Sequence, residues 1–163
     1  DYHWNENKDQ QIKAFECQMQ IAREAQLPII IHSRDAAKDT YDVMKANRAD
    51  EMGGIVHCFS YTKEMAKKFM DMGFYLGIGG VVTFSNARKL QEVVEYMPMD
   101  KMVIETDCPY MSPVPNRGKR NDSFNLPYVV NKIAEIKGIS PTEVIDITCE
   151  NAKNVYGIGR KRI

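Results

Sequence analysis

The sequence predicts an α/β protein with a parallel sheet made of repeated strand–helix units. Four short apolar runs alternate with stretches whose apolar residues recur at helical spacing. The runs begin roughly every 20 to 27 residues, which is the pitch of repeated βα units. No linker or low-complexity segment interrupts this pattern, so we expect one domain over residues 1–163.

The first part of the chain predicts a helix, a strand and a second helix. Over residues 9–26 apolar side chains fall at helical spacing, and Pro28 ends that pattern. The run "IIIH", which ends at His32, follows as the first strand, and its continuous apolar character is typical of a strand buried on both faces. The next helix is predicted over 36–47, with Asp35 as its N-cap.

The middle of the chain repeats this alternation. The run "GIVHCF" is the second predicted strand and contains His57. A helix over 62–72 follows, with Gly73 as its C-cap. The third run is "FYLGIGG", and the helix near 86–97 that comes after it is stopped by Pro98.

The last part contains one more strand and two helices. The fourth run is "KMVIETD", and an irregular segment rich in Pro, Asn, Arg and Lys follows from 108 to about 125. A helix over 126–137 is capped by Gly138. Another begins at Ser140, where "SPTE" is a capping box with proline at the first helical position.

Two architectures accommodate four consecutive parallel strands: part of a (β/α)8 barrel, or an open doubly wound sheet. No G-x-G-x-x-G motif follows the first strand, which weakens the dinucleotide-binding form of the open sheet. The "GIGG" at 77–80 ends a strand but opens no convincing phosphate-binding loop.

Composition narrows the class of protein. Apolar residues make up 44% of the chain and charged residues 27%, which is typical of a folded globular domain. The formal net charge is zero, so any polyanion must be bound by a local patch. No apolar run approaches the roughly 20 residues of a membrane span, and nothing resembles a signal peptide. Four scattered cysteines without C-x-x-C spacing fit reduced thiols, and we expect a cytoplasmic protein.

Three of the predicted strand ends carry side chains that bind metals. His32 ends the first run, His57 ends the second, and Glu105 and Asp107 stand at the end of the fourth. Imidazole together with carboxylate suits Zn²⁺, Mn²⁺ and related divalent cations. Because the carboxyl ends of parallel strands meet at one edge of a sheet, the sequence predicts a metal site there.

Each of these residues also has an ordinary structural interpretation. A single histidine at a strand end is more often hydrogen-bonded within the protein than bound to a metal. Asp107 could cap the turn before Cys108 and Pro109, and Glu105 could be a paired surface acid. Their joint occurrence at equivalent strand ends favours the metal site over three coincidences.

Basic residues near these strand ends are candidates for substrate binding. Arg34 follows the first strand directly, and the loop "PNRGKRND" contains Arg117 and Lys119. Charge-assisted hydrogen bonds from such a loop can hold a phosphate or a carboxylate, although most basic loops are solvated surface. His3 and Trp4 either line the mouth of the pocket or belong to a strand-to-helix turn.

The sequence resembles the TatD family of metal-dependent hydrolases, a group of amidohydrolase-like barrels. The matching stretches are "DYHWN", "LPIIIHSRDA", "GGIVHCFS", "FYLGIGG", "VIETDCPYMSPVPNRGKRN" and "TCENAKNVYG". They extend across essentially the whole chain in the family's order. The resemblance implies part of a (β/α)8 TIM barrel, corresponding to about strands five to eight. Members of the family are described as Mg²⁺-dependent deoxyribonucleases with 3′-to-5′ exonuclease activity, and some relatives act on D-aminoacyl-tRNA.

By position, the resemblance implies that His32, His57 and Asp107 are metal ligands in a site for two divalent ions. Mg²⁺ is the expected metal, with Mn²⁺ and Zn²⁺ as alternatives. Glu105 and Asp107 are the expected catalytic acids, with Asp107 assisting the deprotonation of water. The expected substrate contacts are Arg34, Arg117, Lys119 and Asn121.

The sequence departs from the family pattern at its beginning. The family supplies an H-x-H pair from its first strand and a metal-bridging Glu ahead of an "LDY" segment, and this sequence contains neither. It opens at "DYHWN" without a Met, so we expect the start to be missing and the chain to be a C-terminal portion. A half barrel leaves two strand edges and a wide apolar face uncovered. We therefore expect weak activity or none from the chain alone, and self-association or pairing with a missing half.

Three functions follow from this interpretation. The first is metal-dependent hydrolysis of phosphodiester bonds at the 3′ ends of single-stranded DNA, because a neutral chain favours short engagement of a strand end. The second is hydrolysis of an ester in D-aminoacyl-tRNA, or of an amide in a small metabolite, at the same metal site. The third is a non-catalytic role as a truncated, metal-free scaffold.

Overall fold

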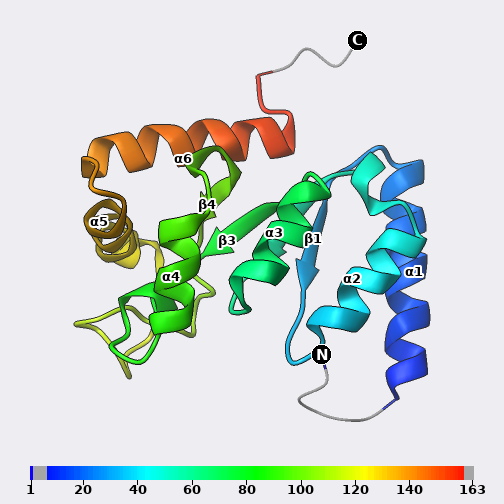
Figure 1. The fold of residues 1–163 in the computed structure, drawn as a ribbon, viewed down its shortest axis with the longest axis horizontal. Coiled ribbons are helices and arrows are strands. Elements are labelled where there is room, and N and C mark those ends of the chain that lie inside the picture. The colour runs from blue at the N-terminus through cyan, green and yellow to red at the C-terminus, as the bar shows by residue number, and fades with distance from the viewer. Residues whose placement is uncertain (2–6, 160–163) are drawn as a thin grey trace.

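The helices and strands follow the predicted order along the chain. The computed structural model describes residues 1 and 7–159 (Figure 1). The helices are α1 (Lys8–Glu24), α2 (Ala37–Ala46), α3 (Lys63–Asp71), α4 (Arg88–Tyr96), α5 (Leu126–Lys137) and α6 (Pro141–Tyr156). The strands are β1 (Ile29–His32), β2 (Gly54–His57), β3 (Tyr75–Ile78) and β4 (Met102–Ile104). The short 3-10 helices are η1 (Ala49–Glu51), η2 (Gly80–Thr83), η3 (Met99–Lys101) and η4 (Ser123–Asn125).

Most helix ends agree with the local signals in the sequence, but two predicted caps differ, and one of them is Gly73, which lies one residue beyond Met72, the C-cap of α3. The hydroxyl of Ser140 accepts a hydrogen bond from the Glu143 backbone at 3.2 Å, as the capping box predicts. Gly138 ends α5 with a φ of 67°, a left-handed conformation that glycine adopts without steric cost. The predicted cap of α2 is wrong. Ala36 occupies the N-cap position, because Asp35 turns the chain with a φ of 54° one residue earlier.

The strands form one parallel sheet with the order β1-β2-β3-β4 (Figure 1). This sequential order is that of a barrel, whereas a doubly wound sheet reverses its strand order at a switch point. The register places His32 directly beside His57 on neighbouring strands. The sheet therefore brings the two histidines of the sequence pattern to the same edge.

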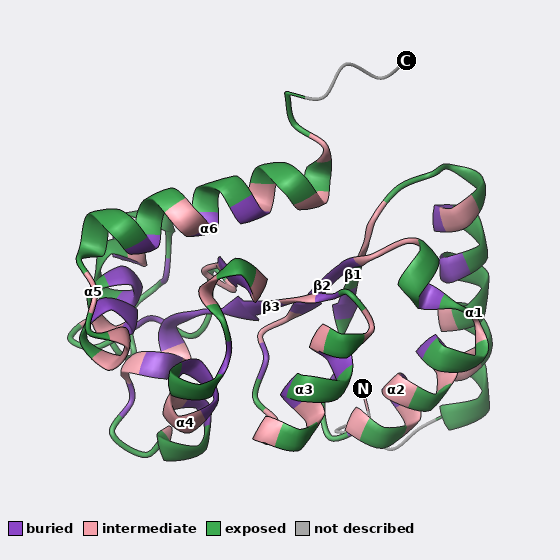
Figure 2. Ribbon diagram, turned by 45° about the horizontal axis from the view of Figure 1, so that its top comes forward, coloured by how far each residue is buried: buried purple, intermediate pink, exposed green. Residues whose placement is uncertain are grey.

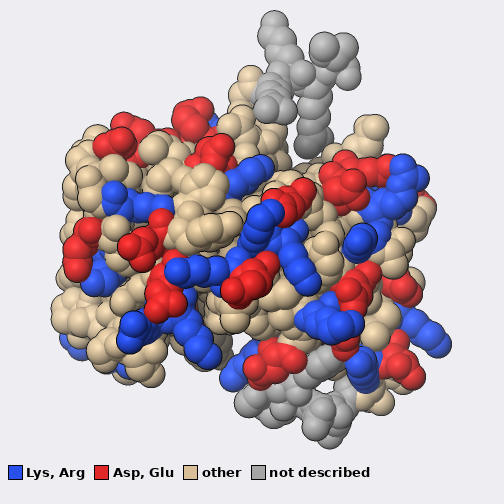
Figure 3. Space-filling view, viewed as in Figure 1, with Lys and Arg blue, Asp and Glu red and all other residues tan. Residues whose placement is uncertain are grey.

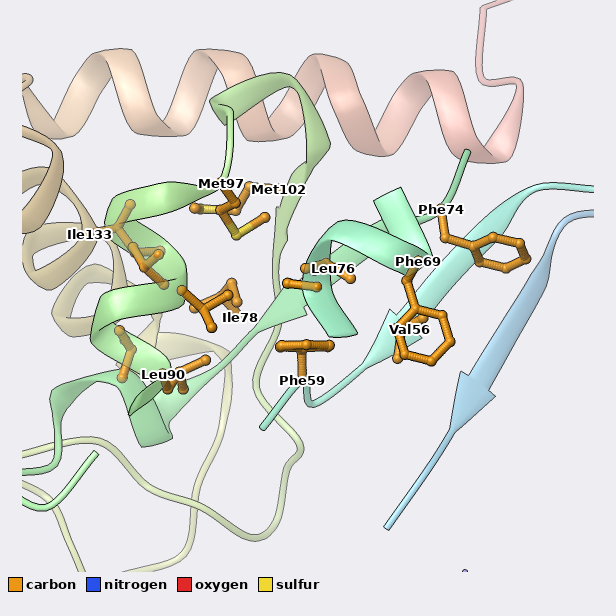
Figure 4. Close-up of a cluster of buried hydrophobic side chains, with 14 of the residues drawn as sticks. Val56, Phe59, Phe69, Phe74, Leu76, Ile78, Leu90, Met97, Met102 and Ile133 are labelled. Atoms are coloured by element: carbon orange, nitrogen blue, oxygen red, sulfur yellow. The ribbon is translucent and has the colours of Figure 1, made fainter. Parts of the chain in front are cut away.

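The hydrophobic core lies between the sheet and the helices that follow its strands. Phe59, Phe69 and Leu76 are buried in it, and the apolar side chains of α4, β4 and α5 continue the same cluster (Figure 4). The helices turn their buried residues inward and leave exposed residues on the outer surface (Figure 2). The core fixes the positions of β2 and β3, whose carboxyl ends form the middle of the sheet edge where His32, His57 and Glu105 lie.

β1 departs from the prediction that its apolar run is buried on both faces. Ile31 is buried, but the side chain of Ile30 is 54% exposed. In the described part of the chain β1 is an edge strand, so one of its edges has no hydrogen-bonded neighbour. An apolar groove of about 600 Å³ runs between α1 and β1 on this side. Within residues 1 and 7–159, no helix is both long and apolar enough to cross a membrane.

The exposed face of β1 generates a prediction about association. An edge strand with exposed apolar residues is a site for intermolecular pairing, and a charged side chain discourages it. We expect the chain to self-associate with rising concentration, and Ile30→Lys to reduce that association. Analytical ultracentrifugation measures the change, and the matched control is Ile145→Lys, which alters a comparably exposed isoleucine on α6. Equal association of the two variants would contradict the prediction.

Candidate metal centre

His32 and His57 form a pair at the carboxyl edge of the sheet. Their ring centroids lie 5.8 Å apart, with an angle of 35° between the ring planes. An imidazole that binds a metal at ~2.1 Å places its ring centre about 3 Å from the ion, so two rings on one ion stand roughly 5 to 6 Å apart. The pair is therefore spaced as two ligands of a common metal would be.

His57 lies between two carboxylates. Its Nδ1 is 2.9 and 3.0 Å from the two oxygens of Glu105, and its Nε2 is 3.2 Å from Oδ1 of Asp107. The hydrogen bond to Glu105 raises the pKa of His57 most, and the charges of Glu105 and Asp107 add to it against the opposing effect of burial. A field that favours a proton on this ring also favours a cation beside it.

Glu105 faces into the protein and is held there by two partners. Besides contacting His57, its Oε1 accepts a hydrogen bond of 2.9 Å from the backbone N–H of Cys58. These contacts turn the Glu105 side chain toward His57 and Cys58, and its expected catalytic role stays a prediction. Both of its oxygens are engaged by β2, and the arrangement is that of a carboxylate that orients a histidine ligand.

Gly77 on β3 makes room for this carboxylate, and the sequence interpretation missed it. A Cβ at Gly77 would lie 2.1 Å from Oε2 of Glu105, far closer than a Cβ approaches an atom to which it is not bonded. The available signal was the "GIGG" run, since a small residue inside a strand often marks a close approach by a neighbour.

Asp107 directs its carboxylate at His57 and does not cap the following turn. The hydroxyl of Thr106 accepts from the Cys108 N–H at 3.2 Å, and the backbone carbonyl of Asp107 accepts from the Tyr110 N–H at 2.9 Å. Because other groups hold the turn, the side chain of Asp107 is free to face the ring. The backbone of Asp107 has a φ of 56°, a left-handed conformation that residues other than glycine rarely adopt outside tight turns and functional sites.

His32 is more exposed than its partner. Its Nε2 lies 3.3 Å from Oδ2 of Asp1. Burial lowers its pKa, followed by the neighbouring imidazole of His57, and the charge of Arg34 acts in the same direction. Arg34 thus belongs to the electrostatic surroundings of the histidine pair, as its position after β1 predicts.

A hydroxyl cluster holds the loop that carries His32 and Arg34. The Ser33 hydroxyl lies 2.9 Å from that of Thr40 and 2.7 Å from that of Tyr61. Tyr61 follows β2, so the cluster joins the loops that leave two adjacent strands. No sequence motif indicated this role, because the three hydroxyls come from separate elements.

The basic loop after β4 contains exposed cationic residues and a buried asparagine. Arg117 stacks its guanidinium over the ring of Phe84 at 3.9 Å, and Lys119 is exposed. Asn121 is only 2% exposed, and its amide donates to the carbonyls of Thr106 and Tyr110 at 2.7 and 2.8 Å. The expected substrate contact by Asn121 is therefore corrected: its amide holds the loop to the end of β4.

The donors fit part of a metal centre. Two donors at ~2.1 Å from one ion stand roughly 3.0 to 3.4 Å apart, and Nε2 of His57 and Oδ1 of Asp107 are separated by 3.2 Å. Among residues 1 and 7–159, no group of three or more His, Cys, Asp and Glu side chains is arranged to hold a metal by itself. His3 and Trp4 lie outside the described residues.

The thiol nearest these residues is not a candidate nucleophile. Cys58 follows His57 directly, and burial together with the charges of Glu105 and Asp107 raises its pKa to about 12. A thiol with that pKa is protonated near neutral pH and is a weak nucleophile. The chemistry of this edge therefore belongs to its imidazoles and carboxylates.

The chain matches a family model described as TatD related DNase over residues 1–157. The chain belongs to this family. A curated relative from Bacillus subtilis, the uncharacterized metal-dependent hydrolase YabD, is 48% identical over 159 residues that cover 97% of this chain and 62% of the relative. The 3′-5′ ssDNA/RNA exonuclease TatD of a Rahnella strain is 33% identical over 159 residues, covering 94% of this chain and 60% of that protein. The chain thus spans about three fifths of the length of these TatD relatives.

The TatD fold is also found in a solved structure. The crystal structure of YJJV, a TatD homologue from Escherichia coli, superimposes on this chain with a TM-score of 0.81 at 26% identity. The match covers 86% of this chain and 54% of that chain. The TIM-barrel-like α/β class implied by the sequence is confirmed by this likeness together with the sequential parallel sheet.

The close approach of Gly77 to Glu105 generates a prediction about stability. In Gly77→Ala the new methyl group forces the carboxylate away from His57 and from the Cys58 N–H. We expect the free energy of unfolding to fall by about 1–3 kcal/mol, as for other overpacked sites. Urea denaturation measures the fall, and NMR titration should show the pKa of His57 returning toward its ordinary value.

Two further variants make this test specific. Gly79→Ala is the matched control, because a Cβ there meets Glu105 atoms only at ordinary distances of 3.5 Å and above. Adding Glu105→Ala to Gly77→Ala should recover part of the lost stability, since the clash is then removed. An unchanged His57 pKa in Gly77→Ala would show that this interpretation is wrong.

Proposed function

We propose that the protein acts in divalent-metal-dependent hydrolysis of phosphodiester bonds at the 3′ ends of single-stranded nucleic acid. The observation that carries this proposal is the placement of His57 between Glu105 and Asp107, beside His32, at the carboxyl edge of a parallel sheet. In barrels of this class the chemistry is located at that edge. The family description and the printed name of the Rahnella relative support phosphodiester bonds as the target.

His57 and Asp107 would hold a divalent ion, and His32 would complete the contribution of this chain. When bound, such an ion supplies Lewis-acid polarisation of a phosphate oxygen and an activated water. The H-x-H pair and the Glu implied by the family have no counterpart in the sequence, so this chain would provide only part of the ligand set. Carboxylate and imidazole donors together suit Mg²⁺, Mn²⁺ or Zn²⁺.

Glu105 and Asp107 have different parts in this proposal. Glu105 accepts the Nδ1 proton of His57, which leaves Nε2 of that ring as the nitrogen with a free lone pair. Asp107 uses Oδ1 toward His57, and its second oxygen is then available to accept a proton from the attacking water. Glu105 is thus a positioning residue, and Asp107 is our candidate for the catalytic base.

Positive charge for the substrate phosphates would come from Arg34, Arg117 and Lys119. Arg34 follows His32 by two residues and acts electrostatically on it, which supports a role for Arg34 near the scissile phosphate. Arg117 and Lys119 lie on the loop that Asn121 fastens to the end of β4. With a net charge of zero, only a few phosphates can be neutralised at once, which favours a strand end over a long tract.

The role of Asp107 leads to a prediction about activity. Asp107→Asn keeps the size of the side chain but removes the negative charge and most of its basicity. We expect cleavage of a 5′-labelled single-stranded oligonucleotide in Mg²⁺ or Mn²⁺ to fall about 10²- to 10⁴-fold, while thermal unfolding is little changed. The measurement uses this chain and any longer product of its gene, with EDTA as the metal-free control.

Products shortened progressively from the 3′ end, and lost in EDTA, would support the proposal. Cleavage that persists in EDTA, or that Asp107→Asn leaves intact, would contradict the assigned chemistry. A folded, metal-loaded protein that hydrolyses D-aminoacyl-tRNA but leaves the oligonucleotide intact would move the assignment to ester hydrolysis.

The role of Glu105 leads to a separate prediction about metal affinity. Glu105→Gln weakens the orientation of His57, and loss of such an outer partner typically lowers metal affinity 10- to 100-fold. We expect the dissociation constant for Mn²⁺, measured by isothermal titration calorimetry, to rise by about that factor. Glu135→Gln on α5 is the matched control, because that exposed carboxylate pairs with Lys132 on the same helix. Equal affinity in the two variants would remove Glu105 from the metal centre.

A further inference from the structure

The segment that follows the metal centre exposes an unusual set of apolar side chains. Between residues 110 and 124, Tyr110 is 71% exposed and Phe124 is 90% exposed, and Met111 and Val114 are also exposed. Burying an aromatic side chain of this size is favourable by itself, so two rings left in water suggest a surface that binds a ligand. Because Tyr110 and Phe124 are both aromatic, they favour a ligand with flat rings that can stack on them.

The same segment is basic, although the chain as a whole is neutral. Arg117, Lys119 and Arg120 are exposed there, and Asp122 is the one acid between residues 108 and 125. On the face of the molecule in Figure 3, by contrast, acidic and basic side chains are interspersed. The guanidinium of Arg117 is fixed in place by its stacking on Phe84. The segment therefore combines accessible rings with a local excess of positive charge.

The segment is held in one conformation by its own hydrogen bonds. The Ser112 hydroxyl donates to the carbonyl of Lys119 at 2.7 Å, and the Val114 N–H donates to the Thr83 hydroxyl at 2.9 Å. The Asn121 amide, near the end of the segment, donates to the carbonyls of Tyr110 at its beginning and of Thr106 just after β4. Because the surface is already ordered, binding a ligand there costs little conformational entropy.

The segment is also connected directly to the candidate chemistry. The backbone N–H of Tyr110 donates to the carbonyl of Asp107 at 2.9 Å. The exposed ring of Tyr110 thus projects from the turn that positions the proposed catalytic base.

We propose that residues 110–124 form a stacking surface for the unpaired bases of a single-stranded nucleic acid. Tyr110 stacks on the base nearest the metal centre, Phe124 stacks on a second base, and Arg117 and Lys119 contact the phosphates between them. Aromatic rings beside cations bind single strands because every base has a π-face that can stack, whereas bases paired in a duplex are covered. The inference deepens the proposed function and rests on it for the identity of the ligand.

Equilibrium binding tests the stacking surface without requiring catalysis. Binding of a short 5′-fluorescein oligothymidylate to the 163-residue chain is followed by fluorescence anisotropy in EDTA, which prevents metal-dependent cleavage. We expect Tyr110→Ala and Phe124→Ala each to raise the dissociation constant about 5- to 100-fold, as loss of a stacked ring does elsewhere. Tyr110→Phe keeps the ring and should bind as the unchanged chain does. Tyr156→Ala, which removes an exposed tyrosine from α6, is the matched control.

An abasic ligand separates stacking from other effects. On a phosphodeoxyribose chain of the same length without bases, Tyr110→Ala and Phe124→Ala should bind as the unchanged chain does, because no base is present to stack. Arg117→Gln should weaken binding of both ligands and reduce the salt dependence of binding by about one phosphate contact. Circular dichroism confirms that each variant is folded.

The possible outcomes decide between the proposals. Failure of the unchanged chain to bind the oligonucleotide, or unaltered binding by both alanine variants, overturns the stacking surface and leaves the exposed rings to a protein partner. If the alanine variants lose as much affinity for the abasic ligand as for the oligothymidylate, the stacking surface is also overturned, because the rings would then affect binding through the structure of the segment and not by contact with bases. Base-dependent binding by the chain, with no cleavage in Mg²⁺ by any longer product of its gene, upholds the surface while refuting the proposed hydrolysis.

Discussion

The candidate site depends on one carboxylate that spans three strands. Glu105 follows β4, yet its oxygens contact the ring of His57 and the backbone N–H of Cys58 at the end of β2. It reaches them by crossing β3 at Gly77, where a side chain would occupy the same space. The interaction therefore requires a glycine on the middle strand, a histidine on one neighbour and an acid on the other. None of the three could change alone without disturbing the other two.

This arrangement also sets the electrostatics of the edge. Two half-buried carboxylates face a single imidazole, so the local field is negative and the pKa of His57 is raised. His32, only one strand away, has a lowered pKa because burial and the neighbouring ring disfavour its charge. Two chemically identical side chains in register thus differ in their readiness to take a proton. A divalent cation relieves the excess of negative charge without requiring either ring to be protonated.

The fold could be predicted from the sequence better than the contacts could. Strands and helices alternate with distinct periods, and the repeat itself placed His32 and His57 at equivalent ends. The exposure of Ile30 could not be read in this way, because an apolar run looks the same in a central strand and at an edge. Asn121 was misassigned for a related reason: a polar residue in a basic motif resembles a ligand-binding group, and only tertiary contacts show its amide holding backbone carbonyls.

Asn121 links the strand ends that carry the candidate metal-binding groups to the segment after β4, a role that the sequence of its loop does not indicate. Its amide donates to the carbonyl of Thr106, next to Asp107, and to that of Tyr110, so one buried side chain holds the backbone on both sides of the proposed catalytic base. The strands provide rigid positions for the metal-binding groups, whereas the segment after β4 provides the surface that selects a ligand. A strand end carries little specificity by itself, since imidazole and carboxylate recognise only a cation. In the proposed function, specificity for a nucleic acid would come from the segment, whose position relative to Asp107 depends on this single amide.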